Sequence, residues 1–390
     1  SRIIFSAHTT PTTDAAMWAR PLLRRSFPPR RSLSFSSDPF PRLLSSSSSP
    51  PASSPPEDPF CVAIIGSGPS GFYTAKYILQ SLSPQKFGPS APRVEVDIIE
   101  RLPHPFGLVR YGIAPDHQDA KNVEEEFRRV MDSHPEHDPH GSAAYFGNVR
   151  VGRDVSLADL TDLYSAVVLA TGAADADRAL GVDGEGLDGV VSARRFVGWY
   201  NGHPEHVGTA AVARALGNGA GRAHAVVVGN GNVALDCARI LSKGGSGLAG
   251  TDVTAAAGDV LGGGVGTVTV AGRRGHGQGA FTIKELREMT KLDKDGYGMQ
   301  FVVRDGELDL GATPATAEEM KSANGGRPKT RIEKLLRSVA SDGGAEEDDG
   351  GARRLHLRFL LSPVRFLPAP DDPSRVGSVV FERTALSGPA

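Results

Sequence analysis

Two glycine-rich turns constrain the fold of this chain more than any other feature of its sequence. The first lies in CVAIIGSGPSGFYTAKYIL, between an apolar run at residues 61–65 and a helical pattern. Gly66 permits a tight turn, Gly68 lets the backbone approach a pyrophosphate, and Gly71 allows the helix to pack closely on the strand. Since the helix N-terminus also offers unpaired N–H groups, the sequence predicts a dinucleotide site in a Rossmann-like βαβ unit.

The strand that follows this helix supports the same site. RVEVDIIE ends in Glu100, whose carboxylate is placed to accept hydrogen bonds from an adenosine ribose. We count Ser70, in the first turn of the helix, among the candidate binding residues. The alternative is an ordinary glycine turn followed by a solvated glutamate, but the order of strand, turn, helix and terminal carboxylate argues against it.

The pattern recurs later in the chain. AVVVGNGNVALDCARIL contains an apolar strand at residues 225–228, a GxGxxA turn that begins at Gly229, and a helix. The next strand, TVTVAG, ends not in an acid but at Arg273 and Arg274. Guanidinium groups bind a 2′-phosphate that a carboxylate would repel, so the second site is predicted to prefer NADP(H) to NAD(H). The alternative is a solvated basic turn.

Composition and cysteine usage exclude several classes of protein. The formal charge is −2, from 43 Lys and Arg against 45 Asp and Glu, which gives no overall attraction to nucleic acid or membranes. Cys61 and Cys237 form no CxxC pair, so a dithiol redox centre and a disulfide-stapled fold are disfavoured. No apolar run approaches the ~18 residues of a membrane span. We expect a soluble two-domain monomer that binds neither nucleic acid nor a metal ion.

The first 58 residues differ in composition from the rest. Residues 1–56 hold seven arginines, no lysine, two acids and a serine tract, a composition typical of an organelle presequence. We therefore expect residues 1–58 to lie outside the fold. MWARPLLRRSF looks like the start of a presequence, which makes residues 1–16 a candidate translated leader. The alternative is a disordered tail without a targeting role.

Three kinds of segment lie outside these motifs. The loop PFGLVRYGIAPDH, residues 105–117, is rich in proline and glycine yet more apolar than solvent-facing loops, so we expect it to wall a bound ligand. AVVLATG, residues 166–172, predicts an apolar strand that ends in a Thr-Gly turn, which marks either the crossover between two dinucleotide-binding domains or merely a buried strand. Two low-complexity stretches, residues 242–266 and 341–351, are expected to be surface loops.

Together these motifs resemble the adrenodoxin reductase family of mitochondrial and bacterial NADPH-ferredoxin reductases. The resemblance rests on GSGPSGFYTA, PFGLVRYGIAPDH, FGNVRVGRDV, SARRFVGWYNG, GNGNVALDCARIL and GRRGHGQGAFTIKELREM, from about residue 61 to residue 292. It implies an α/β protein of glutathione-reductase-like fold, with two Rossmann-like dinucleotide-binding domains and the NADP domain inserted into the FAD domain. The implied FAD domain comprises residues 59–172 and 356–390, and the implied NADP domain comprises residues 173–355.

The resemblance also implies roles for individual residues. It assigns FAD to the first site, through Gly66, Gly68, Ser70, Gly71, Glu100, Leu108 and Val151. It assigns NADP(H) to the second, through Gly229, Asn230, Gly231, Asn232, Val233, Arg273, Arg274 and Glu285. His117 and Glu285 are implied to act as catalytic residues near the flavin–nicotinamide contact. The turn RRGHGQGAF is richer in glycine than is usual in the family, which bears on how firmly it holds its two arginines.

The implied activity is hydride transfer from NADPH to FAD, followed by transfer of single electrons to an acidic [2Fe–2S] ferredoxin in the mitochondrial matrix. One alternative is a flavoprotein electron-transfer module for a partner enzyme. The other is a truncated nucleotide-binding chain that retains FAD poorly and has little activity. Family members continue into a Gly-Trp and Gly-Pro segment along the flavin, whereas here no tryptophan follows Trp199 and the sequence stops at ALSGPA.

Overall fold

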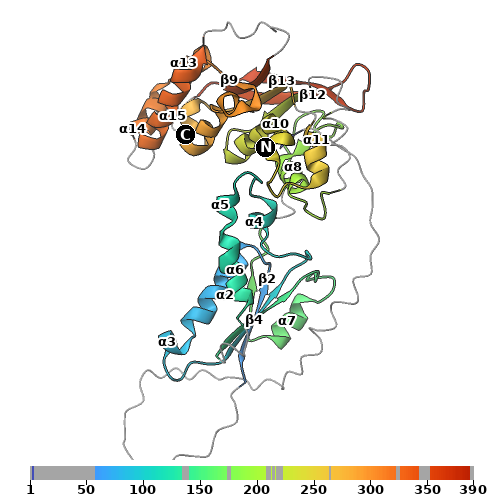
Figure 1. Cartoon of the computed structure of the whole chain (residues 1–390), viewed down its shortest axis with the longest axis vertical. Coiled ribbons are helices and arrows are strands. Elements are labelled where there is room, and N and C mark those ends of the chain that lie inside the picture. The colour runs from blue at the N-terminus through green and yellow to red at the C-terminus, as the bar shows by residue number, and fades with distance from the viewer. Residues whose placement is uncertain are drawn as a thin grey trace, which may run out of the picture. The chain divides into compact units, whose positions relative to one another are not determined.

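A computed structural model describes most of the chain after residue 57. The described residues are 2–3, 58–133, 140–173, 177–207, 212, 216, 223–262, 265–321, 326–341 and 352–386. Internal contacts divide the chain into two compact units, whose helices and strands are labelled in Figure 1 and coloured along the sequence. Unit 1 comprises Ser1–Pro11, Arg110–Lys121 and Asp175–Ala390, and unit 2 comprises Thr12–Val109 and Asn122–Ala174.

Unit 2 is built on a four-stranded parallel sheet in the order β4-β3-β2-β5. The strands are β2 (Phe60–Ile65), β3 (Val94–Ile99), β4 (Gly141–Phe146) and β5 (Ala166–Leu169). The helices are α2 (Pro69–Ser81), α3 (Pro84–Phe87), α6 (Val123–Met131) and α7 (Leu157–Leu163).

The sheet of unit 2 is covered on both faces. Cys61, Ala63 and Ile65 of β2 belong to a core cluster that contains Leu160 of α7. Successive side chains of a strand point to opposite faces, so Ile64 faces the other way, where α2 packs. A parallel sheet buried on both faces explains why the apolar runs of this unit are continuous rather than alternating.

Unit 1 contains a seven-stranded sheet in the order β10-β9-β11-β8-β7-β1-β6. The strands are β1 (Arg2–Ile3), β6 (Val191–Ser192), β7 (His224–Val228), β8 (Thr267–Gly272), β9 (Met299–Arg304), β10 (Ala340–Ser341) and β11 (Arg353–Phe359). The strands from β7 to β10 in this order pair in parallel, whereas β1 pairs antiparallel with β6 and β7. A separate antiparallel pair follows, β12 (Leu361–Pro368) and β13 (Val376–Arg383).

Helices surround the core of unit 1. They are α4 (Leu108–Tyr111), α5 (Gln118–Lys121), α8 (Ala193–Tyr200), α10 (Asn232–Lys243), η1 (Ser246–Leu248), α11 (Ala255–Gly262), η2 (His276–Gln278), α12 (Ile283–Met289), η3 (Asp293–Tyr297), α13 (Asp305–Gly311), α14 (Pro314–Lys321) and α15 (Gly326–Val339), with α4 beginning at the boundary of unit 2. The apolar faces of α8, α10, α12 and α15 join the sheet in one core cluster. Among the described residues, no helix is both long and apolar enough to cross a membrane.

The main elements expected from the sequence are confirmed. The strands at 61–65, 93–100, 166–172, 225–228 and 267–272 correspond to β2, β3, β5, β7 and β8. β5 is nevertheless half-buried rather than buried, and Leu169 at its end is 66% exposed. The first glycine helix, which the sequence predicts to begin at Gly71, begins two residues earlier at Pro69, because proline fits the first helical position. The predicted loop at 242–266 is wrong in part, since α11 forms there and buries Ala257 and Leu261. Most of the stretch at 341–351 lies outside the described residues.

The compact units and the predicted cofactor domains divide the chain differently. Arg110–Lys121 belongs to unit 1, although the sequence groups it with the FAD domain. Residues 356–359 are part of β11, which pairs with β8 and β9 in the sheet of unit 1. The domain boundaries at 59–172, 173–355 and 356–390 therefore stay a prediction about cofactor domains rather than a description of the packing. Of the predicted presequence at 1–58, the structure describes only Arg2–Ile3 and Asp58. Contrary to the expectation that this segment lies outside the fold, Arg2–Ile3 forms β1 and pairs with β6 and β7.

Candidate functional site

The first glycine turn connects β2 to α2 in unit 2. Gly66 has a φ of +109°, and a Cβ at this position would lie 2.3 Å from the Ala170 carbonyl oxygen. A Cβ at Gly71 would lie 2.0 Å from the Gly66 carbonyl oxygen. A Cβ at Gly68 would meet no atom within 4 Å. Two of the three glycines are thus required by the chain itself, and the third leaves open space at a helix N-terminus that no side chain caps.

Glu100 is tied to this turn by hydrogen bonds. Its Oε2 accepts from the Ser67 backbone N–H at 2.9 Å and from the Ser67 hydroxyl at 2.8 Å, and its Oε1 accepts from the Leu102 N–H at 3.0 Å. The structure therefore brings Glu100 to the turn, as the sequence predicts. Each carboxylate oxygen has two lone pairs, so at least one acceptor position remains for a ribose hydroxyl.

Most of the apolar side chains in the loop at 105–117 pack against the protein itself. Phe106, which is 2% exposed, packs against Phe72 with ring centroids 5.4 Å apart, and its N–H donates to the Ser67 carbonyl. A Cβ at Gly107 would lie 2.9 Å from the Gly68 Cα, so the loop lies directly on the glycine turn. Leu108 differs, since it is 70% exposed and is available to a ligand.

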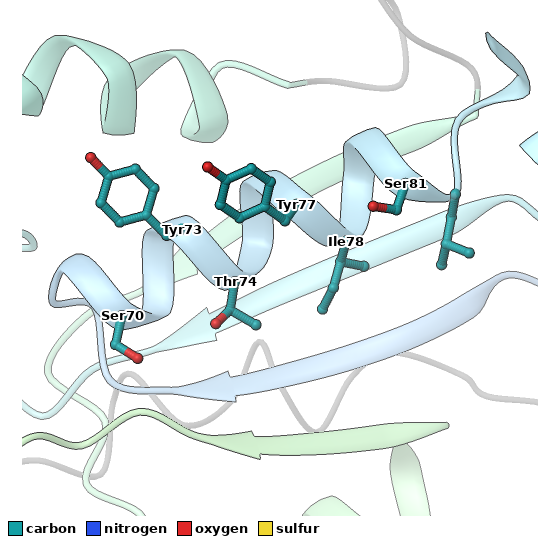
Figure 2. Close-up of a pocket in the computed structure, with 7 residues that line it drawn as sticks. Ser70, Tyr73, Thr74, Tyr77, Ile78 and Ser81 are labelled. Carbon is teal, nitrogen blue, oxygen red and sulfur yellow. The ribbon is translucent and has the colours of Figure 1, made fainter. Parts of the chain in front are cut away.

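Two further candidates of the first site are placed less directly. Val151 is half-buried and packs against the core cluster that contains Ile65, the last residue of β2. Ser70 is exposed in the first turn of α2 and lies at one end of an open pocket along that helix, shown in Figure 2. The residues that line this pocket are Ser70, Tyr73, Thr74, Tyr77, Ile78, Ser81 and Leu82.

The second glycine turn connects β7 to α10 in unit 1. Gly229 has a φ of +143°, and its N–H donates to the Ala271 carbonyl at the end of β8. Gly231 caps α10 without a side-chain hydrogen bond, and Ala234, in the third glycine position, is fully buried. The turn therefore resembles the first in backbone form, and no side chain caps its helix N-terminus, but Ala280 lies against it and donates its N–H to the Asn230 carbonyl at 2.9 Å.

The asparagines of this turn have different roles. The Asn232 Oδ1 accepts a hydrogen bond from the Thr282 N–H at 2.8 Å, which ties the turn to the start of α12. The Asn230 Oδ1 and Nδ2 are both buried and have no hydrogen-bond partner among the described residues. A buried amide without a partner is costly, so this side chain is suited to a ligand or a bound water. Val233 is 51% exposed in the first turn of α10.

Arg273 and Arg274 are exposed at the end of β8. Neither guanidinium forms a hydrogen bond or an ion pair with any residue that the structure describes. Their backbone is nevertheless held, since the Thr384 hydroxyl donates to the Arg273 carbonyl at 2.6 Å and the Leu360 N–H donates to the Arg274 carbonyl at 3.2 Å. The glycine-rich turn is thus anchored by residues far away in the sequence while its two charges remain available.

A cluster of charged residues forms in unit 1, where the end of the loop at 105–117 meets α10 and α12. We call it the Arg239 cluster, and its members are Asp116, His117, Asp236, Arg239, Lys243, Glu285 and Glu288. The structure therefore brings together the two predicted catalytic residues, His117 and Glu285. The hydrogen-bond partner of His117 is nevertheless a residue that the sequence did not single out, since its Nε2 lies 2.9 Å from Glu288 Oε2.

Arg239 lies at the centre of this cluster with a side chain that is 1% exposed. Its Nε and Nη2 donate to the two oxygens of Asp116 at 2.8 and 3.0 Å, and its Nη1 donates to Glu285 Oε2 at 2.9 Å. Nη2 also forms an ion pair with Asp236 Oδ1 at 2.7 Å, without hydrogen-bond geometry. The acidic side chains of α10 and α12 thus share one buried cation.

The protonation of this cluster follows from burial and charge. Burial disfavours ionisation of Asp116, but the hydrogen bonds and charges of Arg239 and Lys243 outweigh burial and hold the pKa of Asp116 well below its usual value. Burial raises the pKa of Glu285, and the neighbouring Asp236 raises it further, whereas Arg239 and His117 act in the opposite direction. Asp116 is therefore a fixed anion, while Glu285 is the acid that protonates more readily than usual.

The cluster also contains a possible set of metal ligands. Ligand atoms of His117, Asp236 and Glu285 all lie within 4.8 Å of one another. The guanidinium of Arg239, however, already contacts Asp236 and Glu285 at 2.7 and 2.9 Å. An arginine at that distance supplies the positive charge that a metal ion would bring, so these residues do not make a convincing metal site.

Sequence reasoning missed Glu288, Asp236 and Arg239. Their spacing carried a signal, because Asp236 and Arg239 lie three residues apart on α10, as do Glu285 and Glu288 on α12. Residues three apart share a helix face, and charges on a largely apolar helix indicate a buried polar contact. The sequence does not say that the two faces meet.

Comparison with known proteins agrees with this geometry. Residues 60–276 match the family described as pyridine nucleotide-disulphide oxidoreductase. The chain is 40% identical over 329 residues to NADPH:adrenodoxin oxidoreductase, mitochondrial, from Arabidopsis thaliana, which covers 84% of this chain and 62% of the relative. It is 42% identical over 332 residues to the Homo sapiens protein of the same name, which covers 84% of this chain and 60% of the relative. The chain thus spans about 60% of the length of these curated relatives.

A solved structure is also similar. It is that of Mycobacterium tuberculosis FprA in complex with NADPH, with a TM-score of 0.67 and 35% sequence identity. The match covers 84% of this chain and 70% of that one. At this identity the similarity extends beyond the parallel-sheet architecture to the sequence that forms it.

Proposed function

The chain belongs to the pyridine nucleotide-disulphide oxidoreductase family and, within it, to the adrenodoxin reductase family, and from this premise we propose that it is an NADPH-dependent flavoprotein reductase that serves a [2Fe–2S] ferredoxin. One observation carries the proposal. The chain contains two open glycine turns of the same backbone form, one bonded to the carboxylate of Glu100 and the other next to the exposed Arg273 and Arg274. Such a pair suits two different dinucleotides.

The first turn fits FAD. The space beside Gly68 is open, and the uncapped N-terminus of α2 offers backbone N–H groups to a pyrophosphate. Glu100 is fixed at the turn with acceptor capacity left for a ribose. We propose that these residues hold the cofactor together with Gly66, Ser70, Gly71, Leu108 and Val151.

The second turn fits NADP(H). The unpartnered amide of Asn230 is a buried group that a ligand would satisfy, and the uncapped N-terminus of α10 follows it directly. We propose that Arg273 and Arg274 bind the 2′-phosphate, since both are exposed beside this turn on an anchored backbone. The turn residues are Gly229, Asn230, Gly231, Asn232 and Val233, and we assign Glu285 to the same site.

The bound cofactors supply the redox chemistry, which is hydride transfer from the nicotinamide to the flavin and release of electrons one at a time. The chain's own contribution is to bind, orient and balance charge. We propose that His117 and Glu285 tune this site rather than carry obligatory acid–base steps, because hydride transfer needs no proton from the protein. Glu288 orients the His117 ring through the contact at Nε2.

The cysteines favour a one-electron acceptor over a disulfide substrate. Cys61 and Cys237 are both buried and no disulfide joins them, and burial raises the pKa of Cys237 well above its usual value. A buried thiol that resists ionisation is a poor nucleophile, so neither residue is suited to dithiol exchange. An acidic ferredoxin is the proposed acceptor, and its association should weaken strongly with added salt.

The experiment that tests this function is a coupled assay. The purified chain is loaded with FAD, and NADPH-dependent reduction of cytochrome c is measured with and without a [2Fe–2S] ferredoxin. The proposal predicts a rate that depends on the ferredoxin and falls as ionic strength rises. A rate independent of ferredoxin would favour an electron-transfer module for another partner, and loss of FAD during gel filtration would favour a nucleotide-binding chain with little activity.

We also propose a mitochondrial location, with residues 1–58 as the presequence. It is supported by the arginine-rich, lysine-free composition of that segment and by the word mitochondrial in the names of the relatives from Arabidopsis thaliana and Homo sapiens. Import of the labelled chain into isolated mitochondria would test it. A chain that stays accessible to protease outside the organelle would contradict the proposal.

A further inference from the structure

Arg239 is the charged residue most completely enclosed by acids in the described part of the chain. Its side chain is 1% exposed, and all three of its nitrogens contact carboxylates. Nη1 lies 3.4 Å from Glu288 Oε2 in addition to its hydrogen bond with Glu285, and Nη2 lies 3.5 Å from His117 Nδ1. One guanidinium therefore contacts both the histidine and the acid that bonds that histidine.

The charges around this guanidinium come from every element packed against it. They are Asp116 and His117 from the segment at 110–121, Asp236 and Lys243 from α10, and Glu285 and Glu288 from α12. Tyr200 of α8 and Cys237 of α10 also lie near, but burial raises both of their pKa values well above the usual range, so they stay neutral. Four carboxylates thus share the charges of Arg239 and Lys243.

Arg239 and Lys243 contact different acids of the cluster. The Lys243 Nζ donates to Asp116 Oδ2 at 2.9 Å. Of these two cations, only Arg239 reaches the acids of α12: its Nη1 lies 2.9 Å from Glu285 Oε2 and 3.4 Å from Glu288 Oε2. Removing Arg239 would leave the acids of α12 near Asp236 without a cation, and like charges in a partly buried site favour proton uptake.

We infer that Arg239 is a positioning residue of the proposed reaction. It acts in two ways, through geometry and through charge. The two-pronged hydrogen bond to Asp116 fixes the backbone next to His117, and the contacts with Glu285 and Glu288 orient these acids toward His117. The charge of Arg239 also opposes the rise in the pKa of Glu285 that burial causes. This inference rests on the proposed NADPH-dependent reduction of FAD, because His117 and Glu285 are assigned to that site.

A purely structural arginine in the same unit provides the matched control. Arg353 donates to the carbonyl oxygens of Val265, Tyr297 and Ser242 at 3.0, 3.0 and 2.7 Å. It is partly buried and uses three donors, as Arg239 does, but its partners are backbone groups. Arg353→Gln therefore removes an arginine that stabilises the unit without changing the charge around His117.

The first experiment compares pH profiles. The FAD-loaded chain and its R239Q, R239K and R353Q variants are mixed with NADPH in a stopped-flow instrument from about pH 5 to about pH 9, and flavin reduction is followed. Loss of the cation in R239Q raises the pKa of the neighbouring acids, so the acidic limb of its profile moves up by at least about one pH unit. R239K keeps the charge and stays near the wild-type profile, as does R353Q.

The second experiment needs no cofactor. Hydrogen exchange at the backbone amides of residues 110–121 is measured in the chain alone. Lysine cannot make the two-pronged bond to Asp116, so R239K and R239Q both accelerate exchange in this segment, by at least about tenfold, while R353Q leaves it unchanged. If R239Q does not fold, R239K alone still separates the effect of geometry from the effect of charge. It is expected to show fast amide exchange at residues 110–121 together with an unshifted pH profile.

The outcomes are distinguishable. Wild-type chain that holds FAD but is not reduced by NADPH contradicts the proposed function, and the exchange experiment still reports on Arg239. Active wild-type chain with the same pH profile and the same exchange in R239Q and R353Q overturns the inference, since Arg239 would then act only as a structural arginine. If the amides of residues 110–121 exchange as slowly in R239K as in wild type, the part of the inference that concerns the hydrogen bond to Asp116 is wrong.

Discussion

The two glycine turns have the same backbone form but leave different groups for a ligand. In unit 2 the polar group at the end of the neighbouring strand, Glu100, is bonded to the turn itself through Ser67. In unit 1 the corresponding groups, Arg273 and Arg274, have no partner in the described part of the chain, and the amide of Asn230 is buried without one. The first site is therefore largely preorganised, whereas the second leaves charge and hydrogen-bonding capacity for its ligand.

The two turns share their backbone geometry and differ in the side chains at the end of the next strand. Shared backbone geometry accounts for pyrophosphate binding in both, because it depends on glycine and on the helix N-terminus. Discrimination between dinucleotides comes from side chains at the end of the next strand, where an acid suits a ribose hydroxyl and a guanidinium suits a phosphate. The following changes test that division, from the largest expected effect to the smallest.

Gly71→Ala tests the shared backbone. Its Cβ would lie 2.0 Å from the Gly66 carbonyl oxygen, so the chain without cofactor should lose about 3 kcal/mol of unfolding free energy. The matched control is Gly68→Ala, whose Cβ meets no atom within 4 Å. The unfolding free energy of that variant should lie within about 0.5 kcal/mol of the wild-type value, yet the variant should bind FAD at least about tenfold more weakly. Urea unfolding and an FAD titration measure the two effects, and equal unfolding free energies for both variants would contradict the packing described.

Replacing Arg273 and Arg274 together with alanine tests the distinguishing part of the second site. The double variant loses charge-assisted bonds of ~1.5–3 kcal/mol each, so the KM for NADPH should rise at least about tenfold while the KM for NADH hardly changes. Arg287→Ala, at an exposed position of α12, is the control for loss of a surface charge. An equal rise in both KM values would mean that the pair does not bind the 2′-phosphate.

Glu100→Gln tests the corresponding side chain of the first site. The amide nitrogen must face either Ser67, which donates twice to Glu100, or Leu102, which donates once, so at least one hydrogen bond is lost. We expect FAD binding to weaken about fivefold, or about 1 kcal/mol. Glu95→Gln on the same strand is the control, since its partner Arg93 is on the surface. Unchanged affinity in the Glu100 variant would show that this acid serves only the turn.

Thr384→Val tests whether the anchoring of the second turn matters. The hydroxyl donates to the Arg273 carbonyl at 2.6 Å, and valine keeps the shape without this bond. We expect the KM for NADPH to rise about two- to threefold, equivalent to about 0.5 kcal/mol. Thr384→Ser retains the hydroxyl and should behave as wild type. If valine and serine gave the same KM, the glycine-rich turn would hold its arginines without help from Thr384.

The sequence predicts the two turns well because their signals are local. A strand, three positions of small residues and a helix lie within about twenty residues, and Glu100 and the two arginines come at the ends of the next strands. A local signal is less informative at the loop 105–117, where Leu108 is exposed but Phe106 is buried. Its apolar content predicts a ligand wall, but Phe106 packs into the core beside Phe72, and only contacts across the fold reveal this.

Apart from His117 and Glu285, which the family resemblance implies, the Arg239 cluster could not be predicted, because its members come from three separate parts of the chain. The helical spacing of Asp236 and Arg239 indicates a polar face on α10, but only the folded chain brings Asp116 and Glu288 to it. The same contacts explain why Arg110–Lys121 belongs to unit 1 rather than to the unit that precedes it in sequence. Long-range pairing of charges leaves no local pattern from which it can be inferred.

The most direct test of the account is anaerobic reduction of the FAD-loaded chain by each nicotinamide dinucleotide. Visible absorbance reports both whether the chain retains flavin and whether that flavin is reduced. The account predicts that NADPH bleaches the flavin band rapidly, that NADH does so at least about tenfold more slowly at the same concentration, and that replacing Arg273 and Arg274 with alanine removes most of this preference. Equal rates with the two dinucleotides in the wild-type chain, or a retained flavin that neither reduces, would contradict it.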